Sequence, residues 1–185
     1  MLFRSVVFQD ATLLPWKTAL ENVLFPLEVQ GRPAQARRES ANAMLELVGL
    51  QDFMHRYPHE LSGGMRQRVS IARGLAQDPR IILMDEPFGT LDEQTRMRMG
   101  QELLTIWERT RKTILLITHS LTEALFLSDQ VLVMSGRPGR IVERIDIDFP
   151  RPRNREDIME DPRYYELRNS ALDFLYNRFA HDEDG

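Results

Sequence analysis

The sequence predicts an α/β fold in which strands and helices alternate along the chain. Two apolar runs without charge, residues 81–84 and 113–117, are typical of strands that are covered on both faces. A shorter run at residues 6–8 reads as the end of another strand. Before residue 81, apolar residues recur with the period of a helix. One face of this predicted helix carries Met65, Val69, Ala72 and Ala76. The 185 residues suffice for one domain with a core.

Two helices are expected in the first quarter of the chain. Thr18 and Glu21 form a T-x-x-E capping box, which is a helix start signal. The helix that begins there should run towards residue 29, and Pro26 should kink or end it. A second helix is expected from about residue 34 to residue 48, because Gly49 is a stop signal.

The middle of the chain supplies the helices that separate the strands. Residues 51–60 look irregular. Ser62 can cap a helix that reaches about residue 77, where an Asp-Pro pair ends it. A long helix should follow Asp92 and reach about residue 110, and a short one should begin at Leu121.

A β-hairpin and a final helix are predicted near the C-terminus. Residues 131–134 and 141–147 flank a Gly-Arg-Pro-Gly turn, which favours a hairpin. Residues 151–155 read as a polar linker, and Asp161-Pro162 opens the last helix. The last helix has an apolar stripe that consists of Leu167, Ala171, Leu175 and Phe179. We interpret this stripe as a face that docks on the domain, and the alternative is a partner-binding helix. The tail from residue 181 is expected to be frayed.

Composition excludes several classes of protein. The net charge of −4 gives no global field that attracts nucleic acid. Without cysteine there is neither a disulfide framework nor a thiolate metal site. No stretch reaches the roughly 20 apolar residues that a membrane-spanning helix needs. If the chain serves a membrane process, we expect it to do so from outside the bilayer.

The strongest chemical signal is Ser62-Gly63-Gly64 at a predicted helix start. Free backbone N–H groups and the positive end of the helix dipole make such a turn an anion site. The Ser62 hydroxyl can add a hydrogen bond to a phosphate oxygen. Taken alone, the motif is equally well read as a capped helix with glycines in its turn.

Polar side chains follow the predicted strands. Asp85 and Glu86 come directly after a buried strand, at the sheet edge where ligands bind in open α/β sheets. Asp85 is suited to hold Mg²⁺ and Glu86 to orient or deprotonate a water. His119 and Gln9 also follow strands and could reach a phosphate, a metal or a water. Individually, each has an ordinary structural interpretation.

Together, these motifs resemble the ABC ATPase family in order and spacing. The Q-loop would be Phe8-Gln9-Asp10 and the signature residues 61–68. Walker B would be Leu83-Met84-Asp85-Glu86-Pro87. The D-loop would be Gly89-Thr90-Leu91-Asp92 and the H-loop Thr118-His119. The resemblance covers residues 6 to about 142. Its one small departure is Met65, where the commonest signature has Gln.

The resemblance implies a fold and a division of the chain. The fold is a P-loop NTPase-like layered α/β sheet with a helical subdomain, truncated at the N-terminus. Residues 1–148 would be the partial ATPase domain, with the helical subdomain at about 13–57. Residues 149–185 would be a linker and an amphipathic helix.

The resemblance also implies cofactors and residue roles, with ATP and Mg²⁺ as the cofactors. Glu86 would activate water, while His119 and Gln9 sense the γ-phosphate. Asp85 would handle Mg²⁺, which the Gln9 amide could also reach. The nucleotide would be contacted, in part across a head-to-tail homodimer, by Ser62, Gly63, Gly64 and Asp92.

The implied partners are a separate transmembrane permease, a second ATPase subunit and, indirectly, a solute-binding protein; nucleic acid is not among them. Residues 8–16 and 57–65 look like the nitrate/sulfonate/taurine import subfamily. The expected location is the cytoplasmic face of the inner membrane. No residue of the chain reads the cargo.

One motif of the family is missing. No G-x-x-x-x-G-K-[S/T] phosphate loop occurs, since the two lysines, Lys17 and Lys112, follow Trp16 and Arg111. Several strands of the family's sheet would be missing as well, which leaves open edges and uncovered apolar surface. We therefore expect the chain alone to bind ATP weakly or not at all and to aggregate.

Two other functions are open at this stage. A truncated module could dock on partners without hydrolysing ATP. A DNA-associated ABC ATPase would share the signature, Walker B and H-loop. The acidic balance and the lack of a long coiled coil weigh against the second.

Overall fold

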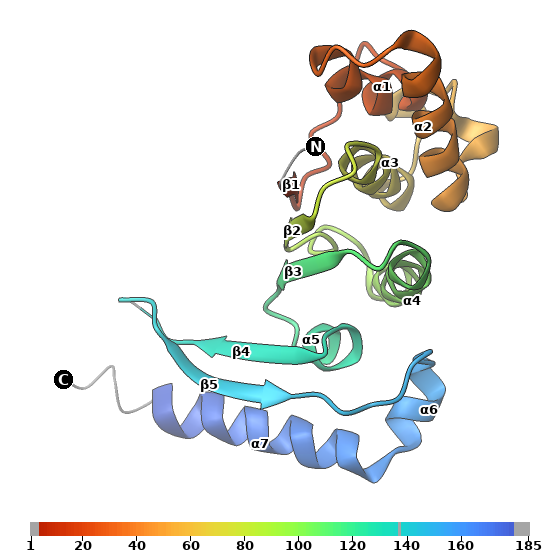
Figure 1. Cartoon of the computed structure of the whole chain (residues 1–185). Helices are drawn as coiled ribbons and strands as arrows, with labels where there is room; N and C mark the ends of the chain where they lie inside the picture. Colours follow the sequence, from red (N-terminus) through yellow and green to blue (C-terminus); the bar gives the residue numbers. More distant parts are fainter. Residues whose placement is uncertain (1–3, 137, 180–185) are drawn as a thin grey trace. The chain divides into compact units, whose positions relative to one another are not determined.

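The computed structural model describes residues 4–136 and 138–179, the last six of them by backbone alone. Its contacts divide the chain into two compact units, Met1–Ile117 and Thr118–Gly185 (Figure 1). We describe each unit by itself. The sequence-based boundary at residue 148 falls inside the second unit and stays a proposal about the family's domains.

A parallel sheet organises the first unit. It consists of β1 (Arg4–Val7), β2 (Ile81–Asp85) and β3 (Thr113–Ile117), in the order β1-β2-β3. Met84 is in register with Val7 on one side and with Leu116 on the other. The predicted alternation of strand and helix is confirmed, and the carboxyl ends of the strands meet at one edge.

The helices of the first unit are α1 (Ala19–Val29), α2 (Ala34–Leu47), α3 (Gly63–Ala76) and α4 (Glu93–Thr110). The capping box at the start of α1 is confirmed: the Thr18 backbone N–H donates to the Glu21 carboxylate at 2.7 Å. Pro26 lies inside α1 and does not end it. Gly49 follows α2 with φ +68°, a conformation in which a side chain would be strained.

Residues 51–60 are more regular than the sequence indicated. They contain two short 3₁₀ turns, η1 (Gln51–Phe53) and η2 (Pro58–Glu60). The Tyr57 backbone N–H donates to the Glu60 carboxylate at 2.7 Å, and this bond fixes η2. Because such turns span three residues, they leave no periodicity that a sequence pattern could reveal.

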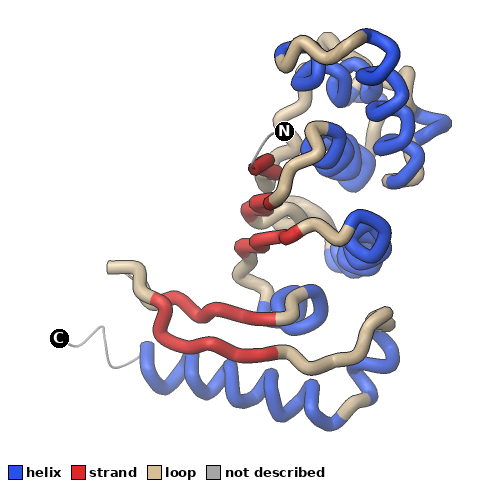
Figure 2. The backbone as a smooth tube through the Cα atoms, in the orientation of Figure 1, coloured by secondary structure: helices blue, strands red, loops and turns tan. Residues whose placement is uncertain are grey.

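Only one face of the sheet is covered in the described part of the chain. Helices α3 and α4 lie on the same side of the strands (Figures 1 and 2), and Ile82 and Met84 are buried on that side. On the other side, Leu115 is 51% and Ile117 56% exposed. The prediction of strands covered on both faces is therefore wrong for residues 113–117, because every second side chain there is exposed. It holds only in part for residues 81–84, where Ile81 and Leu83 are half-buried. The expected uncovered apolar surface is confirmed.

The second unit pairs a hairpin with three helices. It contains α5 (Leu121–Leu127), β4 (Gln130–Met134), β5 (Ile141–Asp146), α6 (Arg155–Glu160) and α7 (Pro162–Phe179). β4 and β5 are antiparallel, which confirms the predicted hairpin. α7 contacts α5 and α6.

The C-terminal helices depart from the prediction in one respect. α6 was not expected; Asn154 begins it by accepting a hydrogen bond from the Glu156 backbone N–H at 3.1 Å. On α7, Ala171 is buried, as a docking face requires. The predicted stripe residues Leu175 and Phe179 have side chains outside the description, and the tail from residue 181 lies outside the described residues.

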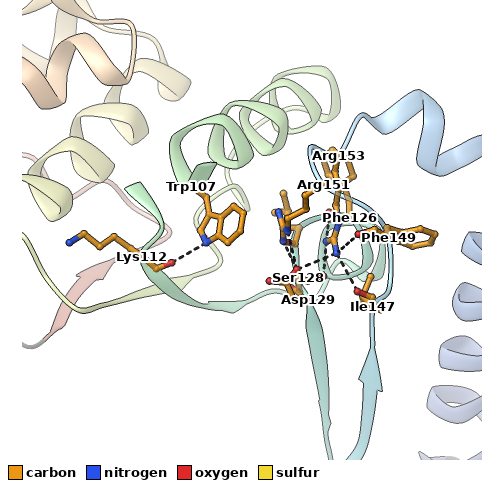
Figure 3. Close-up of polar contacts among 10 residues, drawn as sticks. Trp107, Lys112, Phe126, Ser128, Asp129, Ile147, Phe149, Arg151 and Arg153 are labelled. Atoms are coloured by element: carbon orange, nitrogen blue, oxygen red, sulfur yellow. Dashed lines mark hydrogen bonds and ion pairs between the residues drawn. The ribbon is translucent and has the colours of Figure 1, made fainter. Parts of the chain in front are cut away.

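A buried arginine ties the second unit together (Figure 3). Arg153 is only 3% exposed, and desolvation lowers the pKa of its guanidinium. The guanidinium also lies 3.3 Å from the Asp129 carboxylate. Four backbone carbonyl oxygens accept its hydrogen bonds at 2.7–3.5 Å, those of Phe126, Ser128, Ile147 and Phe149.

Among the helices in the described ranges, none combines the length and the apolar character that crossing a membrane requires.

Candidate functional site

Gln9 and Glu86 meet at the carboxyl edge of the sheet. Gln9 follows β1 and Glu86 follows β2. A Cβ atom placed on Gly89 would lie 2.7 Å from Gln9 Nε2 and 3.3 Å from Glu86 Oε2. The Gln9 amide and the Glu86 carboxylate therefore both lie against residue 89, and the amide can approach this closely only because residue 89 is glycine. The sequence motifs did not reveal this role of Gly89.

The turn after β2 holds Glu86 in a rare conformation. Glu86 has φ +43°, in the left-handed region. Its backbone N–H donates to the Ile117 carbonyl at 2.8 Å, and its carbonyl accepts from the Gly89 N–H at 3.0 Å. Phe88, fully buried, anchors the turn. Such residues cost about 1–3 kcal/mol each and cluster at functional sites. The turn therefore fixes where the Glu86 carboxylate lies.

The residues present fit Mg²⁺ held together with a phosphate. Asp85 is exposed at the end of β2, next to Glu86. No cluster of three His, Asp or Glu side chains able to hold a metal occurs in the described residues. Mg²⁺ at phosphate sites takes only one or two carboxylates and completes its shell with waters and phosphate oxygens. Asp85 supplies the one carboxylate that this limited donor set requires, and the Gln9 amide oxygen as a further ligand stays a prediction.

The Ser-Gly-Gly motif opens α3 as predicted. Ser62 is the N-cap, and its Oγ accepts from the Met65 backbone N–H at 3.3 Å. The N–H groups of the first helical turn have no acceptor within the helix. A Cβ on Gly64 would lie 3.2 Å from Thr95 Cγ2, and one on Gly63 would lie 3.3 Å from Leu91 Cδ2. Both glycines thus also serve close packing against the start of α4.

Asp92 has a structural role at the start of α4. Its Oδ1 accepts from the Thr95 backbone N–H at 2.9 Å, which makes it the N-cap. Hydrogen bonds from Thr95 hold the pKa of Asp92 below its ordinary value. Its assignment to the cofactor stays a prediction. Because the first turn of α4 packs on Gly63 and Gly64, Asp92 belongs to the same region as the signature.

His119 lies in the second unit, next to a fixed turn. The Thr118 hydroxyl donates to the Glu123 carboxylate at 2.8 Å and accepts from the Ser120 backbone N–H at 3.0 Å. Ser120 then caps α5. His119 is exposed at this turn. Its role toward a phosphate stays a prediction.

Sequence reasoning missed two residues that hold the Gln9 segment. Gln67 and Arg73 both lie on α3 and donate hydrogen bonds to the backbone around Gln9. Only the fold brings them there, since about 60 residues separate donor and acceptor. The sequence offered one hint: Gln67 and Arg73 lie in the predicted helix that starts with the signature motif, so they could have been considered as residues that support the site.

Known proteins resemble this chain in sequence and in fold. The family described as "ABC transporter" matches residues 4–89. The chain is 33% identical to the ATP-binding cassette MJ0796, solved as a dimer in a post-hydrolysis state with ADP and phosphate. The TM-score is 0.65, over 80% of this chain and 65% of that one.

Curated relatives match nearly the whole chain. The nitrate import ATP-binding protein NrtD of Synechococcus elongatus is 50% identical over 98% of this chain and 67% of its own length. The bicarbonate transport protein CmpD of Synechocystis is 53% identical over 97% and 65%. The taurine import protein TauB of Rhizobium johnstonii is 49% identical over 94% and 68%. The chain thus spans about two thirds of the length of these relatives, and it belongs to the ATP-binding proteins of the ABC transporter family.

Proposed function

We propose that this chain is the main part of an ATP-hydrolysing subunit that powers import of a small solute through a separate membrane permease. The observation that carries the proposal is the close approach of the Gln9 amide and the Glu86 carboxylate to the same residue, Gly89. At the carboxyl edge of a parallel sheet, these groups stand where a nucleotide phosphate binds in such folds.

In this proposal each polar group has a stated task. Glu86 accepts a proton from the attacking water or orients it, while Gln9 and His119 contact the γ-phosphate. Asp85 holds Mg²⁺, with the Gln9 amide as a further ligand. Mg²⁺ would neutralise charge that develops on the phosphates. The protein's contribution is therefore positioning and electrostatics.

The signature acts across a dimer in this proposal. Ser62, Gly63 and Gly64 would bind the phosphates held by a second subunit, and Asp92 would support that contact through α4. An exposed helix start with a hydroxyl and free N–H groups suits a phosphate. The dimeric state of the MJ0796 cassette supports a pair of subunits. We propose that the two subunits face each other head to tail.

The helical subdomain, residues 13–57, would dock on the permease. Four aromatic side chains there are exposed: Trp16 at 70%, Phe25 at 42%, Phe53 at 42% and Tyr57 at 41%. Large apolar groups left in water mark interaction surfaces when they gather in one region. The subunit would then work at the cytoplasmic face of the inner membrane, and a solute-binding protein would deliver cargo to the permease.

The cargo we propose is a small solute of the nitrate, sulfonate or taurine type. Support comes from the names of the relatives, which import nitrate, bicarbonate or taurine. A pull-down tests whether the subunit serves transport. Retention of a two-protein permease on the immobilised ATPase would support a transport function. Salt-sensitive retention of DNA instead would contradict it.

A first experiment separates binding from hydrolysis. The chain as given lacks a phosphate loop, so isothermal titration with Mg-ATP should show weak binding or none. The chain joined to an upstream segment with G-x-x-x-x-G-K-[S/T] should bind. In that complete ATPase, Glu86→Gln keeps a carboxamide of the same size but cannot take a proton. Hydrolysis should fall by about 10²–10⁴ while ATP binding persists.

The alternative is a module that docks without hydrolysing ATP, which the missing phosphate loop favours. It predicts permease retention by the chain alone and no ATP turnover when the upstream segment is joined. Wild-type turnover in the joined protein would exclude it.

A further inference from the structure

Helix α3 holds the segment that carries Gln9 from both sides. Before Gln9, the buried Gln67 donates from Nε2 to the Phe8 carbonyl oxygen at 3.0 Å. After it, Arg73 Nη2 donates to the Ala11 carbonyl oxygen at 2.9 Å. The same helix begins at Ser62. The position of Gln9 is therefore tied to the helix that carries the signature.

The second clamp acts on a strained residue. Thr12 has φ +46°, and a β-branched side chain rarely adopts this left-handed conformation. Arg73 Nη1 donates to the Thr12 carbonyl at 2.9 Å, and Nη2 lies 3.1 Å from the Thr12 hydroxyl. The Thr12 backbone N–H reaches Asp10 Oδ1 at 3.3 Å. Most of the bonds that hold Thr12 in this conformation come from one guanidinium.

Strain and function coincide in this segment. Gln9, three residues before Thr12, places its amide against the turn that holds Glu86. A left-handed threonine is unfavourable on its own, so the segment would relax without its clamp. Relaxation at Thr12 would move the chain direction at Gln9 and withdraw the amide from Glu86.

We propose that Arg73 is a positioning residue that holds Gln9 beside Glu86 through the strained Thr12, so that α3 and Gln9 move together. The proposal rests on the proposed ATPase function for its kinetic consequence, though not for the clamp itself. Arg73 contacts neither nucleotide nor reacting atoms in this scheme. It acts through the backbone of residues 11 and 12.

The test combines loss of the clamp with relief of the strain. Arg73→Met keeps the apolar stem and removes the donors, and Thr12→Gly removes the cost of the left-handed conformation. Arg32→Ala is the control, because Arg32 also binds the C-terminal end of α3, where it donates to the carbonyl of the C-cap Gln77 and not to the backbone of residues 11 and 12. Amide hydrogen exchange of residues 9–13 is measured in the complete ATPase without nucleotide, so that this result does not depend on hydrolysis. Values of kcat and KM are measured in the complete ATPase.

The expected result has three parts. Arg73→Met raises exchange at residues 9–13 by roughly tenfold, from the cost of a left-handed residue, and lowers kcat more than KM changes. Adding Thr12→Gly to Arg73→Met restores most of both. Arg32→Ala changes neither.

A double variant that stays as impaired as Arg73→Met would overturn the proposal, as would equal exchange in Arg73→Met and Arg32→Ala. If Arg73→Met does not fold, Arg73→Lys replaces it, because a lysine cannot supply the two-pronged donor. Full hydrolysis by Glu86→Gln would refute the proposed function instead, and the exchange data would still decide the clamp.

Discussion

Replacing the buried Arg153 by methionine should unfold much of the second unit locally. Methionine approximates the length of the arginine stem and removes every donor. Asp129 is 66% exposed and also pairs with Arg151 at 2.7 Å, so its ion pair with Arg153 contributes little. The main loss is at the four backbone carbonyls that the guanidinium binds.

The magnitude follows from these bonds. A hydrogen bond to a charged donor contributes about 1.5–3 kcal/mol net, and a buried acceptor left alone costs about 1–3 kcal/mol. Two of the four bonds are weak by length, at 3.3 and 3.5 Å. The guanidinium also regains hydration on unfolding, which offsets part of the gain. We expect a loss of about 3–4 kcal/mol, within the range for breaking buried charge interactions.

Native-state hydrogen exchange measures this loss in the second unit by itself. Protected amides of β4 and β5 should exchange about 10²–10³ times faster in Arg153→Met. The matched control is Arg144→Met, since Arg144 is 62% exposed and pairs with the exposed Asp146 at 3.4 Å. It should change exchange by less than about fivefold. Equal effects of the two variants would refute the claim that the buried hydrogen bonds of Arg153 stabilise the second unit.

Three further predictions concern the first unit. Gly89→Ala should displace the Gln9 amide and lower ATP turnover while leaving stability nearly unchanged, because the obstructing atom ends a flexible side chain; melting temperature and hydrolysis rate decide this. The hydrogen bond from Lys112 lowers the pKa of the Asp78 carboxyl. The pair is exposed, so it stabilises the folded chain by at most about 1 kcal/mol. This stabilisation is present above about pH 3.9 and is lost as the pH falls further. The stability difference between wild type and Lys112→Met should vanish over that range. Leu115→Lys should reduce aggregation of the isolated chain in light scattering, because it places a charge on the open sheet face.

Local signals explain what the sequence predicted well. The caps at Thr18, Ser62 and Asp92 are each completed by a residue three positions on, so the pattern lies within one helical turn. The strand ends that carry Gln9 and Glu86 followed from short apolar runs. These two kinds of signal sufficed to place most elements.

Long-range and conformational features escaped the sequence. Whether the second face of β3 is covered depends on residues elsewhere in the fold. The apolar run at residues 113–117 would read the same in either case. The clamp from Arg73 spans 61 positions to Thr12 and 62 to Ala11 along the chain. The left-handed conformations of Thr12 and Glu86 occur at residues that ordinarily avoid them, so composition indicated neither.

The central claim is that Ser62 of one subunit and Glu86 of another complete a single ATP site. Ser62→Asp keeps a good helix cap but sets a negative charge at the phosphate position, and Glu86→Gln removes the base. Each variant of the complete ATPase should be nearly inactive alone.

The decisive measurement is the ATP hydrolysis rate of an equimolar mixture of these two variants. Random pairing would leave one intact site in half of the dimers, so the mixture should recover about a quarter of the wild-type rate. A mixture no more active than its components would contradict the account.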